Sequence, residues 1–476
     1  MEKQPRLLAS QLLLKNRVFE VLLNRVILTW KEIPANKKRV SGSIHHPFKV
    51  GFCFPKFLHR GKGESASRPK HLLVYINPYG GKQQGKRIYE QKVAPLFACA
   101  SISTDVIVTE HANHARDHLR TEAELKQYDG VVCVGGDGMF SEIVHGLVFR
   151  AQKDNGVDQN SPEEKLVPCT LRIGIIPAGS TDCICYATVG INDPVTSALH
   201  IIVGDSQPMD VCSVHHNNTF LRYSVSLLGY GFYGDVLADS VRKRWMGPAR
   251  YDFSGFKTFL THHHYEGVVS FLPATDTLGT PGDQTRCRAG CFICQHDGQL
   301  YTEDSPEKCK TAPDVSDSEN EGGWGVIRGK FLAINAASMS CACPRSPKGL
   351  SPAAHLADGT TDLILVRKCS RFNFLRHLLR HTSKDDQFDM TFVEVHRVRR
   401  FRFTPCQNDS ELDLRENGKQ LFSQICHPAY SSWNCDGEIL PHAAIEVGVH
   451  CQLIKLFARG IEEQSLFEDL AHPCAL

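Results

Sequence analysis

The feature that most constrains the fold is a regular alternation of short apolar runs and longer polar segments between His71 and Pro177. The apolar runs cover residues 71–77, 105–110, 130–135 and 171–177, and the segments 85–100, 114–128 and 140–148 between them have helical patterns. Short apolar runs that alternate with helices are typical of βαβ units with a parallel sheet. The sequence therefore predicts an α/β domain with a mostly parallel sheet over residues 68–209.

The second half of the chain has a different pattern. Beyond about Asp210 one candidate strand follows another, at residues 221–232, 267–273, 329–337, 361–368, 387–398 and 444–457. Several of these runs alternate apolar and polar residues, as strands with one buried face do. We expect an antiparallel β-sandwich domain over residues 210–462 and a tail at 463–476. Within it, residues 296–323 carry eight Asp/Glu against two Lys and are expected to form a disordered insertion.

Charge is unevenly distributed along the chain. The formal net charge of +2 hides a basic N-terminal segment, because residues 1–70 contain 15 Lys/Arg against 4 Asp/Glu. Such a segment can be attracted to an anionic membrane surface or to nucleic acid, and a solvated, partly disordered leader has the same composition. No apolar run approaches the roughly 18–20 residues that cross a bilayer, and no signal peptide is recognisable. We therefore expect a cytosolic protein, with most of its 19 cysteines reduced.

Three loops that contain glycine follow the predicted strands. They are Asn77-Pro78-Tyr79-Gly80-Gly81-Lys82, Gly135-Gly136-Asp137-Gly138 and Pro177-Ala178-Gly179-Ser180-Thr181-Asp182. Open parallel sheets bind ligands at the carboxyl ends of their strands, and glycine lets backbone amides approach phosphate oxygens. The first loop has neither the Walker A spacing nor the dinucleotide fingerprint. Considered singly, the first and third loops are equally compatible with structural turns.

The second loop makes the sharpest chemical prediction. Asp137 stands among three glycines before a helix, so its carboxylate can accept a proton from an attacking hydroxyl or hold Mg²⁺. The alternative is that Asp137 caps the helix. Glu142, one turn into that helix, can point back at the same site or face solvent.

Taken together, the three loops resemble the diacylglycerol kinase catalytic-domain family, whose lipid kinases act on diacylglycerol, sphingosine or ceramide. The segments that are similar to the ceramide kinase branch of the family are 223–236, 243–255, 287–294 and 431–438. The resemblance covers most of residues 68–462. It implies an α/β nucleotide domain and a β-sandwich with ATP held between them.

The resemblance also implies roles for individual residues. The implied ATP contacts are Asn77, Pro78, Tyr79, Gly80, Gly81, Thr109, Glu142, Arg244, Arg250, Asp436, Gly437 and Glu438. The implied substrate contacts are Gly135, Gly136, Asp137, Gly138, Ser180, Asp182 and Asp235. Asp137 matches the catalytic base of the family, and the two arginines match residues that face the phosphates. The chain departs from the wider family at Met139, where Thr is common, and at residues 179–182.

The function implied by the resemblance is ATP- and Mg²⁺-dependent phosphorylation of the primary hydroxyl of ceramide. The expected location is cytoplasmic with peripheral attachment to the Golgi or plasma membrane, with no nucleic-acid partner. The alternatives are a sphingosine or diacylglycerol kinase, an NAD kinase with a similar GGDG loop, and a non-catalytic lipid- or calmodulin-binding adaptor. Residues 1–67 are faintly similar to a pleckstrin-homology domain, and we expect a shortened remnant of one.

Two further patterns stay open. Cys287, Cys291 and Cys294 are crowded as in a metal site, but tetrahedral zinc needs a fourth ligand, for which His296 and Cys309 are candidates. Redox-sensitive or packing thiols are the alternative. The basic amphipathic segment 371–384 is typical of calmodulin targets or anionic-membrane binding, and equally of an ordinary packed helix.

Overall fold

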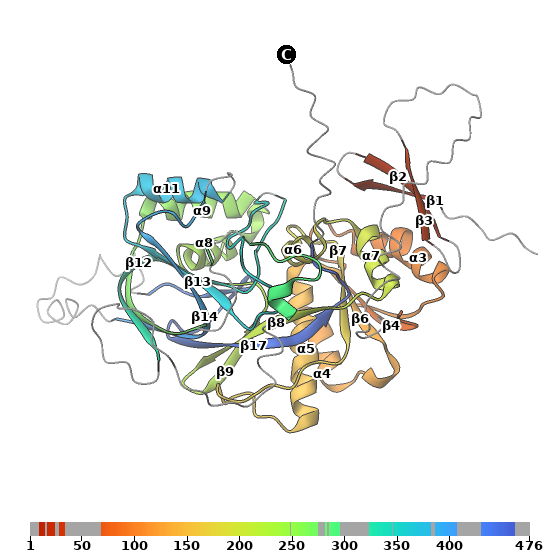
Figure 1. Cartoon of the computed structure of the whole chain (residues 1–476), viewed down its shortest axis with the longest axis horizontal. Helices are drawn as coiled ribbons and strands as arrows, with labels where there is room; N and C mark the ends of the chain where they lie inside the picture. Colours follow the sequence, from red (N-terminus) through yellow and green to blue (C-terminus); the bar gives the residue numbers. More distant parts are fainter. Residues whose placement is uncertain are drawn as a thin grey trace, which may run out of the picture.

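The computed structural model describes the backbone of three N-terminal strands and most of the chain beyond residue 67. The described ranges are 9–14, 17–23, 28–33, 68–247, 249–274, 281–282, 285–295, 323–344, 346–381, 386–406 and 430–461. Strands β1 (Ala9–Leu14), β2 (Arg17–Leu23) and β3 (Leu28–Ile33) form a separate antiparallel sheet (Figure 1). The predicted tail at 463–476 and the predicted insertion, apart from Gly323, lie outside the described residues.

The predicted parallel sheet is present. It consists of β4 (His71–Ile76), β5 (Ser103–Val108), β6 (Gly130–Gly135) and β7 (Arg172–Pro177), in the order β5-β4-β6-β7 with every pair parallel. Because β5 lies on one side of β4 and β6 lies on the other, the strand order reverses between β4 and β6. Ligands of open α/β sheets bind in the crevice that such a reversal creates at the carboxyl ends of the strands.

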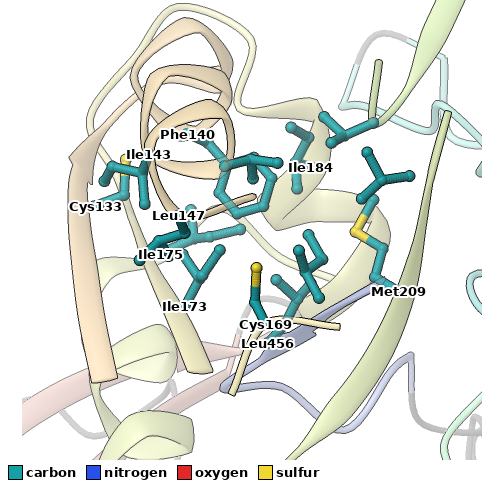
Figure 2. Packing of buried hydrophobic residues seen from close by; sticks show 14 of the residues in the cluster. Cys133, Phe140, Ile143, Leu147, Cys169, Ile173, Ile175, Ile184, Met209 and Leu456 are labelled. Atoms are coloured by element: carbon teal, nitrogen blue, oxygen red, sulfur yellow. The ribbon is translucent and has the colours of Figure 1, made fainter. Parts of the chain in front are cut away.

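Helices cover both faces of this sheet. On one face lie α4 (His114–Thr121) and α5 (Asp137–Asn155), and on the other lie α2 (Gly85–Ile88), η1 (Tyr89–Val93), α3 (Ala94–Cys99) and α7 (Pro194–Val203). Phe140, Ile143 and Leu147 of α5 pack against Ile173 and Ile175 of β7 (Figure 2). Apolar burial thereby fixes the start of α5, where Asp137 lies.

The second half of the chain forms antiparallel strands. They are β8 (Gln207–His216), β9 (Thr219–Ser224), β10 (Leu227–Gly231), β11 (Tyr265–Pro273), β12 (Gly325–Ala337), β13 (Thr361–Arg367), β14 (Val393–Pro405), β15 (Asn434–Cys435), β16 (Glu438–Ile439) and β17 (Ile445–Leu456). Strand β17 pairs antiparallel with β8 and β14 and parallel with β7. Within the described chain, both halves therefore share one 14-stranded mixed sheet, rather than forming two separate sheets.

Several elements of this half differ from the sequence prediction. The expected strand at 221–232 is two strands, β9 and β10, and the expected strand at 387–398 begins only at Val393. Strand β8 and the helices α8 (Phe232–Val241), η3 (Arg244–Met246) and α9 (Ala249–Thr261) were not predicted, whereas α11 (Arg371–Arg380) was. Among the helices described, none is long and apolar enough to cross a membrane.

Candidate active site

The three glycine loops meet at the crevice between β4 and β6. The amide of Asn77, directly after β4, donates to the carbonyl of Val134 in β6 over 3.0 Å. The amide of Ala178, directly after β7, donates to the carbonyl of Gly135 over 3.1 Å. These bonds extend the sheet ladder into the loops, so the first loop is tied to the end of β6 and the third loop is tied to the second loop.

Glycine is required where the loops touch. A Cβ atom on Gly179 would lie 2.5 Å from Cα of Gly136, and one on Gly81 would lie 2.6 Å from the carbonyl oxygen of Ala178. Gly138 is different, since it is exposed and a Cβ there would meet no atom within 4 Å. Gly138 is therefore the glycine of the second loop that faces open space, where a ligand can approach.

The first loop is held by a local polar turn. Asn77 Oδ1 accepts from the amides of Tyr79 (2.9 Å) and Gly80 (3.1 Å). Beside it, the buried Thr109 donates its amide to the carbonyl of Ile76 over 2.9 Å. The structure thus brings together Asn77, Tyr79, Gly80 and Thr109, which come from the ends of two adjacent strands.

Asp137 joins two helices. It is the first residue of α5, yet its carboxylate accepts from the first amides of α6 (Cys183–Val189), those of Cys183 (3.1 Å) and Ile184 (2.9 Å). Burial raises the pKa of the Asp137 carboxyl, the two amide bonds lower it, and the charge of Asp436 raises it again. The carboxylate is therefore held in place, with a proton affinity above that of an ordinary Asp.

Asp182 is a second desolvated carboxylate beside Asp137. Its backbone is left-handed (φ 52°), and its side chain accepts from the amide of Gly179 at 2.9 and 3.2 Å. Burial raises the pKa of the Asp182 carboxyl to about 6, and the charge of Asp137 contributes to the increase. By contrast Ser180, in the same loop, is exposed.

Glu142 lies one turn into α5 and is partly enclosed. Its Oε2 atom is buried and has no hydrogen-bond partner. Burial raises the pKa of the Glu142 carboxyl, whereas a hydrogen bond from the Asn113 amide and the charges of Arg116 and Arg222 lower it. Glu142 therefore faces the start of α4 and strand β9 of the second half.

Asp436, in the turn between β15 and β16, comes from the opposite end of the sequence. Its carboxylate accepts from three successive amides and from two serine hydroxyls at 2.6 to 3.2 Å; the donors are Val225 N, Ser226 N, Leu227 N, Ser224 Oγ and Ser226 Oγ. These bonds separate β9 from β10, which is why the expected single strand is interrupted. The charge of Asp436 acts on Asp137, so this turn lies near the second loop.

The neighbours of Asp436 in the turn are less enclosed. The amide of Gly437 donates to Asn434 Oδ1 over 2.8 Å, and the side chain of Glu438 is exposed. Gly437 therefore shapes the turn, and Glu438 is accessible from solvent.

The other predicted site residues of the second half lie apart from the loops. Asp235 accepts from Tyr265 Oη (2.7 Å) and Ser431 Oγ (2.6 Å), and burial raises the pKa of its carboxyl. Arg244 is exposed, and Arg250 lies over the ring of Tyr251 at 4.7 Å. In the part of the chain that is described, no hydrogen bond or ion pair joins these residues to the three loops.

A cavity of about 280 Å³ opens beside the first and third loops. Its lining includes the backbone of Gly179, the carboxylate-bearing Asp182, and the basic residues Lys82, Arg87 and Lys92. Basic side chains around glycine backbone favour an anion such as a phosphate. The sequence prediction did not include Arg87 and Lys92, although a run of basic residues after the first loop was visible.

Comparisons with known proteins match both halves of the chain. A model of the diacylglycerol kinase catalytic domain matches residues 71–214, and a model of the ceramide kinase C-terminal domain matches residues 226–474. The chain is 65% identical to the ceramide kinase of Homo sapiens over 406 residues, which cover 83% of this chain and 75% of that one. The chain belongs to the ceramide kinase family.

A second relative and a third family model support the assignment, and a solved structure shows the same fold. The ceramide kinase of Mus musculus is 62% identical over 416 residues, covering 85% of this chain and 78% of that protein. A model of the ceramide kinase pleckstrin-homology domain matches residues 8–52. A solved structure of a diacylglycerol kinase-type protein from Bacillus anthracis superimposes with a TM-score of 0.52 at 13% identity, over 82% of this chain and 98% of that one, and shows the same fold.

These matches confirm the predicted family and fold. The roles of single residues remain predictions. One departure from the wider family now has a structural explanation. Met139 is buried, and its Cβ lies 2.8 Å from where a Cβ on Gly135 would be, so the methionine packs under the loop. The side chain at position 139 is therefore part of the hydrophobic core.

One residue between the two halves was missed by the sequence prediction. Arg222 of β9 donates to Ser141 Oγ of α5 over 3.3 Å, and its charge acts on Glu142. It connects the second half to the helix that begins with Asp137. The pairing of β8 with both β9 and β17 brings β9 close to α5, and no local motif signals that pairing.

Proposed function

We propose that this chain is an ATP-dependent kinase that phosphorylates the primary hydroxyl of ceramide and forms ceramide 1-phosphate. Membership of the ceramide kinase family supports the reaction and the use of ATP. The observation that carries the assignment of chemistry to this site is the position of Asp137. Its carboxylate has a raised pKa and lies where three glycine loops meet at the reversal of strand order.

In the proposed mechanism, Asp137 accepts the proton of the ceramide hydroxyl. The hydroxyl oxygen forms a bond to the γ-phosphorus while the bond to the β-phosphate oxygen breaks, and ADP leaves with that electron pair. The amides of Cys183 and Ile184 keep the carboxylate oriented during the transfer. Because burial raises the pKa of Asp137, it is a better proton acceptor than a solvated Asp.

The nucleotide phosphates are proposed to lie along the glycine loops. Lys82 and Arg87 beside the third loop supply positive charge, and Arg244 and Arg250 are proposed to reach the phosphates from the second half. Arg250 has an Nε atom that is buried without a hydrogen-bond partner, which leaves a donor available for a phosphate oxygen. This arrangement holds ATP between the two halves.

The residues present also fit a magnesium ion. Magnesium prefers carboxylate oxygens, and Glu142 Oε2 is a buried oxygen with no partner, in the helix that begins with Asp137. Glu142 would hold the ion together with the nucleotide. The ion would neutralise negative charge on the phosphates.

A lipid panel tests the proposed activity. Purified protein is incubated with labelled ATP and ceramide, sphingosine, diacylglycerol or NAD, and the products are identified by mass spectrometry. The proposal expects ceramide 1-phosphate as the main product. Preference for another acceptor would assign the chain to an alternative kinase, and no product with any acceptor would favour a non-catalytic adaptor.

Peripheral membrane association is proposed as the way the enzyme reaches its insoluble substrate. The pleckstrin-homology match and the net charge of 15 − 4 = +11 in residues 1–70 both favour an anionic lipid surface. Helices α9 and α11 are neighbours, because Arg371 of α11 donates to the carbonyl of Leu260 in α9 (Figure 1). Each carries an exposed phenylalanine that could contact a lipid surface: Phe256 of α9 is 64% exposed and Phe372 of α11 is 74% exposed. Cytoplasm, Golgi and plasma membrane remain the expected compartments.

Deletion of residues 1–65 tests the membrane proposal. The shortened protein should bind anionic vesicles more weakly, and salt should weaken binding of the intact chain in the same way. Activity on a short-chain ceramide in detergent should be retained better than activity on ceramide in vesicles. Calmodulin binding to the segment 371–384, which includes α11, is the competing proposal, and a pull-down with and without Ca²⁺ decides it.

A further inference from the structure

Four metal-ligating side chains gather outside the proposed active site. They are Cys287, Cys291 and Cys294 from one short segment and His355 from a separate loop, and one ligand atom from each lies within 4.8 Å of the others. The sequence alone suggested His296 or Cys309 as the fourth member, and both lie outside the described residues. The fold supplies His355 instead.

The distances between these atoms match a metal site better than a disulfide. The Sγ atoms of Cys287 and Cys294 are 3.7 Å apart, whereas a disulfide needs about 2.05 Å. Two thiolates bound to one tetrahedral zinc at about 2.3 Å lie about 3.8 Å apart. Cys291 Sγ and His355 Nδ1 are 3.3 Å apart, close to the separation expected for a sulfur and a nitrogen on the same ion.

The segment that carries the cysteines is also held by bonds to other parts of the chain. In residues 285–295, the amide of Ala289 donates to the carbonyl of Ile461, and Gln452 Nε2 donates to the carbonyl of Cys294. The His355 loop has its own anchor, since the amide of Asp210 in β8 donates to the carbonyl of Leu356 over 2.7 Å. A metal ion bound by both the segment and the loop would therefore join two separately anchored parts of the chain.

We propose that Cys287, Cys291, Cys294 and His355 bind one structural zinc ion. Three sulfurs and one imidazole nitrogen fill all four positions of tetrahedral zinc and leave none for a substrate, as in structural sites. The cysteines bind as thiolates, so zinc binding releases thiol protons to solvent. With Nδ1 on the metal, His355 keeps its proton on Nε2, which is buried without a hydrogen-bond partner.

The carboxylate of Asp358 favours this orientation of His355. Asp358 lies close enough for its charge to interact with His355, and its Oδ2 atom is also buried without a partner. A carboxylate near the second nitrogen of a metal-bound histidine fixes the orientation of the ring. Asp358 thus contributes negative charge near the proposed site.

The proposed zinc would also support the catalytic half. A small cavity of about 30 Å³ is lined by Ala187 of α6 together with Cys287 and Leu356. The opposite end of α6 supplies the two amides that hold Asp137. The zinc-linked segment therefore packs against the helix that positions the proposed base.

The direct test is the metal content of the full chain. Protein purified without chelators is dialysed and analysed by inductively coupled plasma mass spectrometry, and about one zinc per chain is expected. The variants Cys294→Ser and His355→Ala should lose most of it, whereas Cys99→Ser and His442→Ala, which replace the same residue types elsewhere, should keep it. Folded wild-type protein without zinc would overturn the proposal, whether or not the variants fold.

A second measurement separates zinc from the competing thiol chemistry. Free thiols are counted in denaturant with and without a chelator, and the thermal melting temperature is recorded for both samples. The proposal expects fully reduced thiols and a lower melting temperature after zinc removal. A disulfide between two of the three cysteines, with no change on chelation, would contradict it. Neither readout uses kinase activity, so the zinc site and the proposed function can fail independently.

Discussion

The two halves of the molecule supply polar groups to the site in different ways. In the α/β half, each contribution is a short loop after a strand, and the loops bond to one another through backbone atoms. In the second half, Asp436 reaches the centre through a turn, while Asp235 and Arg250 lie on helices and contact other residues of the second half. The loops of the α/β half are therefore in place before any ligand binds. The residues of the second half are expected to complete the site when the ligand binds.

The largest expected effect comes from the contact between loops. In Gly179→Ala, the added Cβ would lie 2.5 Å from Cα of Gly136, so one of the loops must move. We expect turnover to fall at least about 10²-fold, because displacement of catalytic groups by about 1 Å has effects of that size. Steady-state kinetics with ceramide measures it, and thermal melting should show a destabilisation of about 1–3 kcal/mol.

Gly138→Ala is the matched control. The added methyl group meets no atom within 4 Å, so the melting temperature should stay at the wild-type value. If substrate approaches this open position, the KM should rise without a loss of stability. Equal losses of stability in Gly179→Ala and Gly138→Ala would contradict the distinction between a glycine that contacts another loop and one that faces open space.

A smaller effect is expected in the second half. Removing a hydrogen bond to a charged group loses about 1.5–3 kcal/mol, so Arg250→Ala or Arg244→Ala should lower kcat/KM for ATP about 10- to 100-fold. The preference among lipids should not change. Arg242→Ala, an exposed arginine of the same segment, serves as control. A changed lipid preference with normal ATP kinetics would place the two arginines on the acceptor side.

The smallest effect concerns stability as a function of pH. The pKa of the Asp182 carboxyl is raised from 3.8 to about 6 in the folded state, so the fold prefers the protonated form. The stabilisation from this group is present below about pH 4 and is lost as the pH rises through about 6. In Asp182→Asn that loss is absent, so the variant should gain stability relative to wild type across this window. Urea unfolding at several pH values measures it, and a parallel pH dependence in both proteins would contradict it.

The sequence predicts the α/β half well because its signals are local. Each strand is a short apolar run, and each loop carries its own glycines, so β6 matches the predicted residues 130–135. Asp137 was predicted as a site residue, but the identity of its partners was not, since the first amides of α6 lie far along the chain.

The second half was predicted less accurately because its structure depends on distant contacts. Residues 221–232 look like one strand, and only Asp436 shows why the strand is broken. Likewise, His355 has no local signal that links it to Cys287, Cys291 and Cys294. The exposed aromatic residues of α9 obscured the helical pattern.

The measurement that tests the central claim most directly compares Asp137→Asn with Asp129→Asn. Both carboxylates accept two backbone amides, but Asp129 binds Lys70 and His71 at the opposite end of the strands. The account predicts that Asp137→Asn binds ATP like wild type while phosphoryl transfer to ceramide falls at least about 10²-fold, and that Asp129→Asn keeps full activity. Near-normal turnover in a folded Asp137→Asn protein would contradict the assignment of Asp137 as the base.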